Sequence, residues 1–226
     1  MAEVLGGYAE ALILAGRGDE AKSSLDEALS LSRELKNDEM TAETLGFQGD
    51  GFFYRGDFKS ASALYAQALQ AATRSKEPGA ILIAKVNVAK VQVQEKHAQE
   101  AIASLRQLIQ QADDLGLKYT SVECSILMAQ GLMLNHNSTD ARQELGRASL
   151  LSNKLGMQPL SAQAHFLLAT IARDSGNASD AQDHYREALR LLDAMKKDPG
   201  AEKALQRADF KSINEEAKRA TLAVKN

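Results

Sequence analysis

The chain has 226 residues, of which 44% are hydrophobic and 25% charged, a composition typical of globular proteins rather than disordered or fibrous ones. Its 27 Lys and Arg residues are balanced by 30 Asp and Glu residues, which argues against a nucleic-acid-binding surface. One cysteine, Cys124, cannot form an internal disulfide and cannot hold zinc by itself. Abundant alanine, only 3 prolines and 5% aromatic residues predict an all-α fold.

The start of the chain, residues 1–16, has no basic leading segment, and Glu3 and Glu10 interrupt its apolar residues. We therefore interpret it as neither a signal peptide nor a membrane span. The sequence predicts a cytoplasmic protein that binds neither nucleic acid nor membrane.

A repeat of 40 residues runs through the chain in five copies. In three copies a glycine, a short polar turn and an alanine follow one another, in segments 16–21, 56–61 and 176–181. The same step relates the alanines that follow the turns, which are Ala21, Ala61, Ala101, Ala141 and Ala181. Upstream it relates small residues, which are Ala9, Gly49, Ala89, Ala129 and Ala169. A fixed period predicts stacked copies of one unit, and small columns predict close helix contacts.

Apolar residues lie at helical spacing on both sides of each turn, so each copy predicts a helical hairpin. The first helices are expected over 2–16, 39–55, 79–95, 119–135 and 159–175. The second helices are expected over 19–35, 58–74, 98–115, 138–155 and 178–196. Pro78, Pro159 and Pro199 fall at junctions between copies, where the first turn of a helix tolerates proline. We expect one domain, 1–226, with repeats at about 1–38, 39–77, 78–117, 118–157 and 158–197 and a capping helix over 199–223.

These features together resemble the tetratricopeptide repeat. The likeness rests on the small residue within the first helix, the Gly-Asp-Phe turn at 56–58 and the Ala-x-x-x-Tyr-x-x-Ala-Leu run at 61–69, which recurs at 181–189. It covers residues 2 to about 196 and implies a right-handed α-α superhelix that binds a protein or peptide segment in its concave groove, without catalysis or cofactor. Two departures stand out, because the period exceeds the usual 34 residues and Lys96 and His136 replace the turn glycine.

A second likeness concerns the end of the chain. Segment 198–209 and the long repeats are similar to the carboxy-terminal repeat regions of bacterial eukaryotic-type serine/threonine kinases, although this sequence contains no kinase motif. The alternative function is therefore a regulatory or sensing carboxy-terminal module of a larger bacterial signalling protein, either a kinase or a transcription regulator.

The two ends of the repeat array differ in polarity. Apolar side chains cover more of the first helix than one partner helix can hide; they are Leu5, Tyr8, Leu12, Ile13 and Leu14. This end is either a cut edge or a surface that pairs with a second copy to give a homodimer. The other end predicts a capping helix. Its expected packing residues are Leu205, Ala208, Ile213 and Ala217, and its expected solvent-facing residues are Lys203, Arg207, Lys211, Glu215, Glu216, Lys218 and Arg219.

No catalytic or metal-binding set emerges from the repeat pattern. None of the four histidines stands four residues from another, the spacing that points two imidazoles at one metal ion from one helix. His165 and His184 come from two helices of one hairpin and are expected to approach each other, but a third ligand is missing. Cys124 is expected to be a buried, inert thiol.

The groove residues are predicted from columns that change between copies while the packing columns stay small or apolar. In the central repeats the predicted groove residues are Phe47, Asp50, Tyr54, Asn87, Lys90, Gln94, Glu123, Leu127 and Gln130. The amino-terminal half of this surface is acidic, which favours a partner segment carrying Lys or Arg. Asn87 and Lys90 are the only pair comparable to the lysine and asparagine set that grips a terminal carboxylate in chaperone-binding relatives, so chaperone-tail capture is not expected.

Overall fold

The computed structural model describes residues 1–201 and 203–223, and these residues are helical with no strand. The elements are α1 (Ala2–Leu14), α2 (Lys22–Glu34), α3 (Asp38–Phe53), α4 (Phe58–Ser75), α5 (Pro78–Gln94), α6 (Ala98–Asp114), α7 (Lys118–Leu134), α8 (Ser138–Lys154), α9 (Gln158–Asp174), α10 (Ala178–Met195), the 3-10 helix η1 (Ala204–Gln206) and α11 (Ala208–Ala223).

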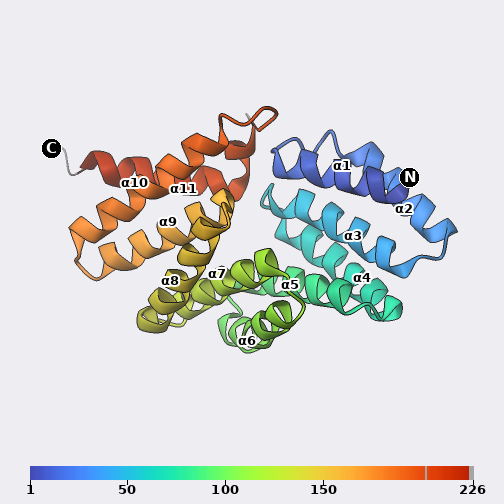
Figure 1. Ribbon diagram of the computed structural model, residues 1–226, viewed down its shortest axis with the longest axis horizontal. Helices are drawn as coiled ribbons and strands as arrows, with labels where there is room; N and C mark the ends of the chain where they lie inside the picture. The colour runs from blue at the N-terminus through green and yellow to red at the C-terminus, as the bar shows by residue number, and fades with distance from the viewer. Residues whose placement is uncertain (202, 224–226) are drawn as a thin grey trace.

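The helices form five hairpins and a closing helix, arranged as a right-handed α-α superhelix. Each helix packs against the next, and the odd-numbered helices α1 to α9 also contact one another in order, which places them on the inner side of the curve. Figure 1 shows that the array bends into an arc, which brings α10, α11 and the segment between them back beside α1 and α3. The all-α prediction is confirmed.

The backbone turns through the left-handed region at positions spaced 20 residues apart. Within the described residues these positions are Gly16, Lys36, Gly56, Lys76, Lys96, Gly116, His136, Gly156 and Gly176. Turns within hairpins and turns between them therefore both contain one left-handed residue. Lys96 and His136 have φ values of 64° and 58°, so losing the turn glycine does not change the turn, although glycine adopts this conformation at lower cost.

The hydrogen bonds at these turns explain why the helices stop there. Except after Lys76, the residue that follows each of these left-handed positions donates its N–H to a carbonyl five residues earlier, as from His97 to Gln92 at 2.9 Å and from Asn137 to Leu132 at 2.8 Å. After Lys76 the N–H of Glu77 donates to the hydroxyl of Ser75 at 3.2 Å instead. This pattern satisfies carbonyl groups that the end of a helix would otherwise leave free. Side chains cap several of the helices that follow, and the capping residues are Asn37, Asp57, Asn137 and Asn177.

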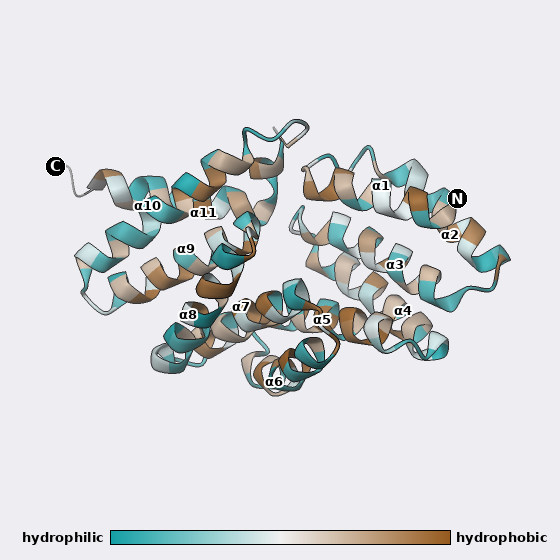
Figure 2. Ribbon diagram, viewed as in Figure 1, coloured by the Kyte–Doolittle hydropathy of each residue, from teal (hydrophilic) through white to brown (hydrophobic). Residues whose placement is uncertain are grey.

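The small-residue columns are buried where helices approach closely. Ala9, Ala89, Ala129 and Ala169 are at most 1% exposed, and Gly49 is buried beside Tyr65. A Cβ atom at Gly49 would overlap the Tyr65 ring, so this contact requires glycine. Figure 2 shows hydrophobic residues along α5 and α7 and more hydrophilic ones along α8 and α10.

Two of the expected helices differ from the observed ones by more than two residues at one end. Expected over 19–35, α2 begins at Lys22 because Arg17 stands where Asp57 caps α4, and residues 18–21 form a turn instead. The capping helix expected over 199–223 is replaced by η1, a break at Arg207 with φ −57° and ψ 143°, and α11.

The break exchanges the expected exposure of two side chains of this helix. Arg207, expected in solvent, is 7% exposed, whereas Ala208, expected to pack, is exposed. Ile213 and Ala217 are buried as predicted, and Leu205 packs partly buried against residues of α10 and α11. Phe210, which the sequence pattern missed, is fully buried.

Candidate functional site

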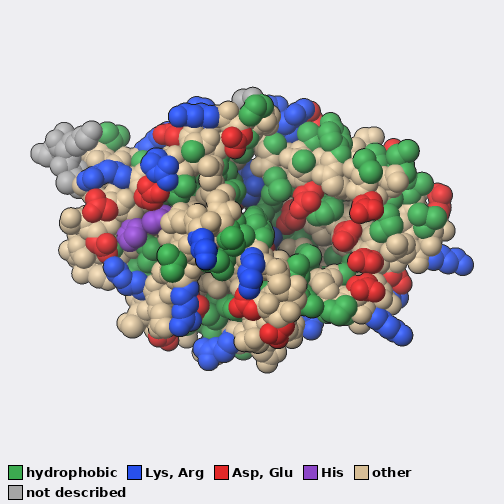
Figure 3. All heavy atoms as spheres, viewed as in Figure 1, with side chains coloured by type: hydrophobic (Ala, Val, Ile, Leu, Met, Phe, Trp, Pro, Cys, Tyr) green, Lys and Arg blue, Asp and Glu red, His purple; other side chains and the backbone are tan. Residues whose placement is uncertain are grey.

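Two adjoining cavities open on the inner side of the arc, where Figure 3 shows a hollow in the molecular surface. The acidic cavity, about 560 Å³, lies among α1, α3, α5 and α7 and also contacts Met195 and Arg207. The amide cavity, about 270 Å³, lies among α3, α5, α7, α9 and α11. Tyr54, Lys90 and Glu123 line both.

The structure brings all nine predicted groove residues to these cavities. The acidic cavity is lined by Phe47, Asp50, Tyr54, Asn87, Lys90 and Glu123. The amide cavity is lined by Tyr54, Lys90, Gln94, Glu123, Leu127 and Gln130. Three of the nine, Asn87, Lys90 and Leu127, are less than 9% exposed, so they support the walls more than they present a surface.

Lys90 is the centre of a buried charge network between the two cavities. Its Nζ lies 3.3 Å from Asp50 Oδ1 and 3.0 Å from Glu123 Oε1, and the hydroxyl of Tyr65 donates to Asp50 at 2.7 Å. Burial alone would lower the pKa of Lys90, but the charges of Asp50 and Glu123 outweigh it and raise the pKa well above the ordinary lysine value. Lys90 therefore remains charged and holds the two carboxylates in place.

Arg207 is the residue of this region that the sequence pattern placed wrongly. Its guanidinium lies 3.6 Å from the centre of the Tyr54 ring and 4.6 Å from that of Phe210. It donates to the carbonyl of Leu14 at 3.3 Å and pairs with Asp209 at 2.7 Å. No feature of the repeat could have indicated this position, because residues 199–210 follow the last copy.

Carboxylates without cationic partners form one wall of the acidic cavity. Glu10 and Glu43 line it, and neither carboxylate has a hydrogen bond or an ion pair with any described residue. Burial raises the pKa of Glu10, with further contributions from Asp50 and Glu43, and burial also raises the pKa of Glu43. Figure 3 shows acidic side chains gathered around the hollow on the half formed by α1 and α3. The acidic amino-terminal half predicted from the sequence is thus present.

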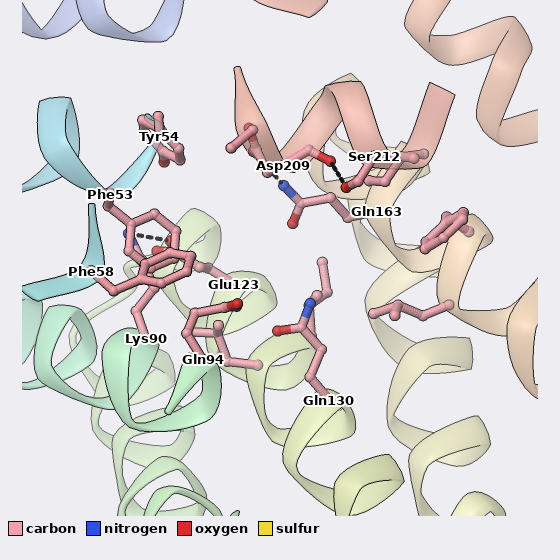
Figure 4. Close-up of a pocket in the computed structure, with 16 residues that line it drawn as sticks. Phe53, Tyr54, Phe58, Lys90, Gln94, Glu123, Gln130, Gln163, Asp209 and Ser212 are labelled. Carbon is pink, nitrogen blue, oxygen red and sulfur yellow. Dashed lines mark hydrogen bonds and ion pairs between the residues drawn. The ribbon is translucent and has the colours of Figure 1, made fainter. Parts of the chain in front are cut away.

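Three glutamines from successive inner helices reach the amide cavity. Gln94 comes from α5, Gln130 from α7 and Gln163 from α9 (Figure 4). Gln163 donates to Asp209 of α11 at 3.3 Å, whereas the side-chain oxygen of Gln130 is buried with no hydrogen-bond partner among the described residues. Buried acceptors of this kind are costly unless a donor reaches them.

The two histidines of the fifth hairpin meet as predicted, with His165 Nδ1 and His184 Nδ1 2.9 Å apart. Burial lowers the pKa of both residues. Within the described residues, no group of three His, Cys, Asp or Glu side chains is placed to hold a metal ion. Cys124 is buried, and burial raises the pKa of its thiol to about 12, so it is not a reactive thiolate at neutral pH.

Comparison with known proteins agrees with this geometry. A family model described as "Tetratricopeptide repeat" matches residues 1–74. The chain folds as a tetratricopeptide-repeat solenoid. No curated protein matches it. Within the part of the chain that the structure describes, no helix is both long and apolar enough to cross a membrane.

Three solved structures with this arrangement of helices extend the comparison. BtubC (BKLC) from P. vanneervenii is 17% identical with a TM-score of 0.61, covering 92% of this chain and 91% of that chain. The putative kinesin light chain TPR-like repeats of Podosopora anserina are 14% identical with a TM-score of 0.57, covering 87% and 97%. A signal transduction ATPase (STAND) protein with a tetratricopeptide repeat sensor, from Pyrococcus horikoshii, is 11% identical with a TM-score of 0.62, covering 99% and 35%. At these identities the likeness concerns the fold.

Proposed function

We propose that this chain is a non-catalytic scaffold that binds a protein or peptide segment in the concave groove of its tetratricopeptide-repeat solenoid. One observation carries the proposal: the nine groove residues predicted from columns of the sequence line two adjoining cavities on the inner side of the arc. Interaction with other proteins is also the role that this fold class supports.

The chemistry of the walls suggests how a segment is held. Phe47 and Tyr54 offer apolar and aromatic surface for anchoring side chains. Gln94 and the unpartnered oxygen of Gln130 provide hydrogen bonds for the main chain of an extended ligand. Apolar anchors would thus supply affinity, and the amides would fix the register.

The proposal also covers the domain organisation, the cellular location and the oligomeric state of the chain. We propose that residues 1–226 act as one cytoplasmic domain that requires no cofactor and binds neither nucleic acid nor membrane. A homodimer through the first hairpin is a further part of the proposal, supported by Val4 at 71% exposed, Tyr8 at 57% and Leu14 at 41%.

Selection of peptides from a random displayed library tests the groove. Gln94→Arg changes an exposed wall residue of the amide cavity, and Gln107→Arg makes the same change on the exposed face of α6. We expect selected peptides to lose at least tenfold in affinity for Gln94→Arg and to bind Gln107→Arg as they bind the wild type. Equal binding to all three proteins, or no enriched peptide, would refute the proposal. Lys90 is left intact, because Lys90→Glu would place a third carboxylate beside Asp50 and Glu123.

The second candidate function is a regulatory or sensing carboxy-terminal module of a larger bacterial signalling protein, either a serine/threonine kinase or a transcription regulator. It is favoured by the alignment of 99% of this chain with 35% of a signal transduction ATPase whose name includes a tetratricopeptide repeat sensor. Sequencing the native reading frame tests it. Kinase or DNA-binding motifs encoded upstream of Met1 would support this function, and a reading frame that starts at Met1 would exclude it.

A further inference from the structure

Residues 203–208, the closing segment, cross from the last hairpin to the first two and contact them through side chains and main chain. Lys203 Nζ lies 3.8 Å from Glu20 Oε1, and the N–H of Ala208 donates to the carbonyl of Tyr54 at 2.8 Å. At Gly16 the approach is so close that a Cβ atom would overlap the carbonyl oxygen of Lys203. These contacts join the two ends of the arc in Figure 1.

Arg207 is the principal contact of the closing segment. Its guanidinium lies against the rings of Tyr54 and Phe210, and its N–H groups reach the carbonyl of Leu14 and the carboxylate of Asp209. Burial of an arginine is costly unless its charge and its donors are satisfied. Stacking on an aromatic face and charge-assisted hydrogen bonds supply that compensation here. The surface around Tyr54 therefore recognises a guanidinium.

The contacts of the closing segment are of the kind that a groove makes with a peptide ligand: a stacked side chain, a main-chain hydrogen bond and a second cation near a carboxylate. We propose that the surface formed by Leu14, Glu20 and Tyr54 is a receptor for an arginine-bearing basic segment of a partner protein, and that the closing segment occupies this receptor in the structure described here. The proposal rests on the proposed function, because it names the partner chemistry of the same groove.

Charge complementarity indicates why a partner segment would displace the closing segment. Arg207 brings its own counter-charge in Asp209, so it does not neutralise the unpartnered Glu10 and Glu43 of the adjacent cavity. A partner segment with Lys or Arg residues on both sides of its central arginine would also compensate these carboxylates. The favoured occupant is therefore more basic than the closing segment itself.

The closing segment can leave the receptor without unfolding α11. That helix packs on α9 and α10 through Phe210, Ile213 and Ala217, independently of the first two hairpins. Ala208 is its first residue, a position at which helices tolerate proline, and the dihedral angles of Arg207 suit a residue before proline. Ala208→Pro thus removes the N–H that binds the Tyr54 carbonyl and preserves the helix.

Fluorescence anisotropy with a labelled peptide of residues 203–212 tests the proposal in the full chain. We expect Arg207→Ala/Ala208→Pro to bind this peptide at least tenfold more tightly than the wild type, whose receptor is filled. Replacement of the peptide's arginine by alanine should abolish binding, as should addition of Tyr54→Leu to the double variant. Because Lys211 is exposed and outside the closing segment, Lys211→Ala serves as the control and should behave as the wild type does.

Equal binding to the wild type and the double variant, or binding that does not need the peptide's arginine, would overturn the proposal. So would a dimer of the double variant that the peptide does not dissociate, because a second copy would then be the occupant. Circular dichroism checks folding, and Arg207→Gln replaces the double variant if that variant unfolds; failure of both to bind the peptide counts against the receptor. If peptides from the random library still bind in a Gln94-dependent way, only the arginine receptor fails and the proposed function stands.

Discussion

The second and fifth hairpins place a buried tyrosine at the same repeat position and use it differently. Tyr65 and Tyr185 are 0% and 1% exposed. The hydroxyl of Tyr65 donates to Asp50 at 2.7 Å, whereas that of Tyr185 accepts from Arg173 at 3.1 Å. Arg173 in turn pairs with Glu216 of α11 at 2.6 Å. The first tyrosine supports the wall of the cavities, and the second joins its hairpin to the closing helix.

This difference shows that the repeated residues determine the helix packing, whereas the residues around them determine which polar network each tyrosine joins. Alanine and tyrosine columns give both hairpins the same frame. The charges beside that frame, Asp50 in one hairpin and Arg173 in the other, decide whether the polar network serves the groove or the end of the array.

The largest expected effect lies in the network of the second hairpin. Lys90→Met leaves Asp50 and Glu123 without their shared cation, and removal of one partner of a buried ion pair costs about 3–5 kcal/mol. Urea unfolding should show a fall in the free energy of unfolding of about this size. Lys85→Met, at an exposed position of the same helix, is the control and should change it little. A small effect of Lys90→Met would mean that solvent reaches the network.

The helix contact of the second hairpin is the next most sensitive feature. Gly49→Ala forces a methyl group into the Tyr65 ring, and overpacking of this kind costs about 1–3 kcal/mol. The fifth hairpin already carries Ala169 at this position. Gly146→Ala, in a helix position with open space around it, should instead stabilise the protein by up to about 1 kcal/mol. Thermal unfolding distinguishes the two, and equal shifts would contradict the close contact.

Removal of each tyrosine hydroxyl tests the comparison directly. Tyr65→Phe deprives Asp50 of a donor, and a hydrogen bond to a charged group is worth about 1.5–3 kcal/mol. Tyr185→Phe should cost less, because Arg173 keeps its partners Asp174 and Glu216. Denaturant unfolding of the two variants side by side provides the measurement. The reverse order would show that the fifth hairpin depends more on its tyrosine.

The smallest expected effect is a pH dependence of the fifth hairpin. Burial lowers the pKa of His165 and of His184 in the folded state, so the unfolded chain binds protons first, near pH 6.5. Their contribution to stability is present above that pH and is lost as the pH falls through the lowered pKa values. Unfolding at pH 7.5 and 5.5 should show this loss, and it should shrink in His165→Gln. The same change at the exposed His97 should leave the pH dependence intact.

The sequence predicted the hairpins and named residues that line the two cavities, because both follow from the 40-residue period. Tertiary contacts of the closing segment could not be predicted in this way. Its hydrogen bond from Arg207 to Leu14 joins residues 193 positions apart. The repeated columns of the sequence do not indicate this contact. The amphipathic pattern of 201–223 favoured one continuous helix, but Arg207 has a non-helical backbone and packs on the Tyr54 ring.

The equal spacing of the left-handed turns has a consequence for how this protein can change length. Since the turns repeat a left-handed residue every 20 positions, one more hairpin could be inserted with turns of the kind already present. Such an insertion would nevertheless move Arg207 away from Tyr54 and separate the two ends of the arc. The contact between the two ends therefore depends on the array having five hairpins.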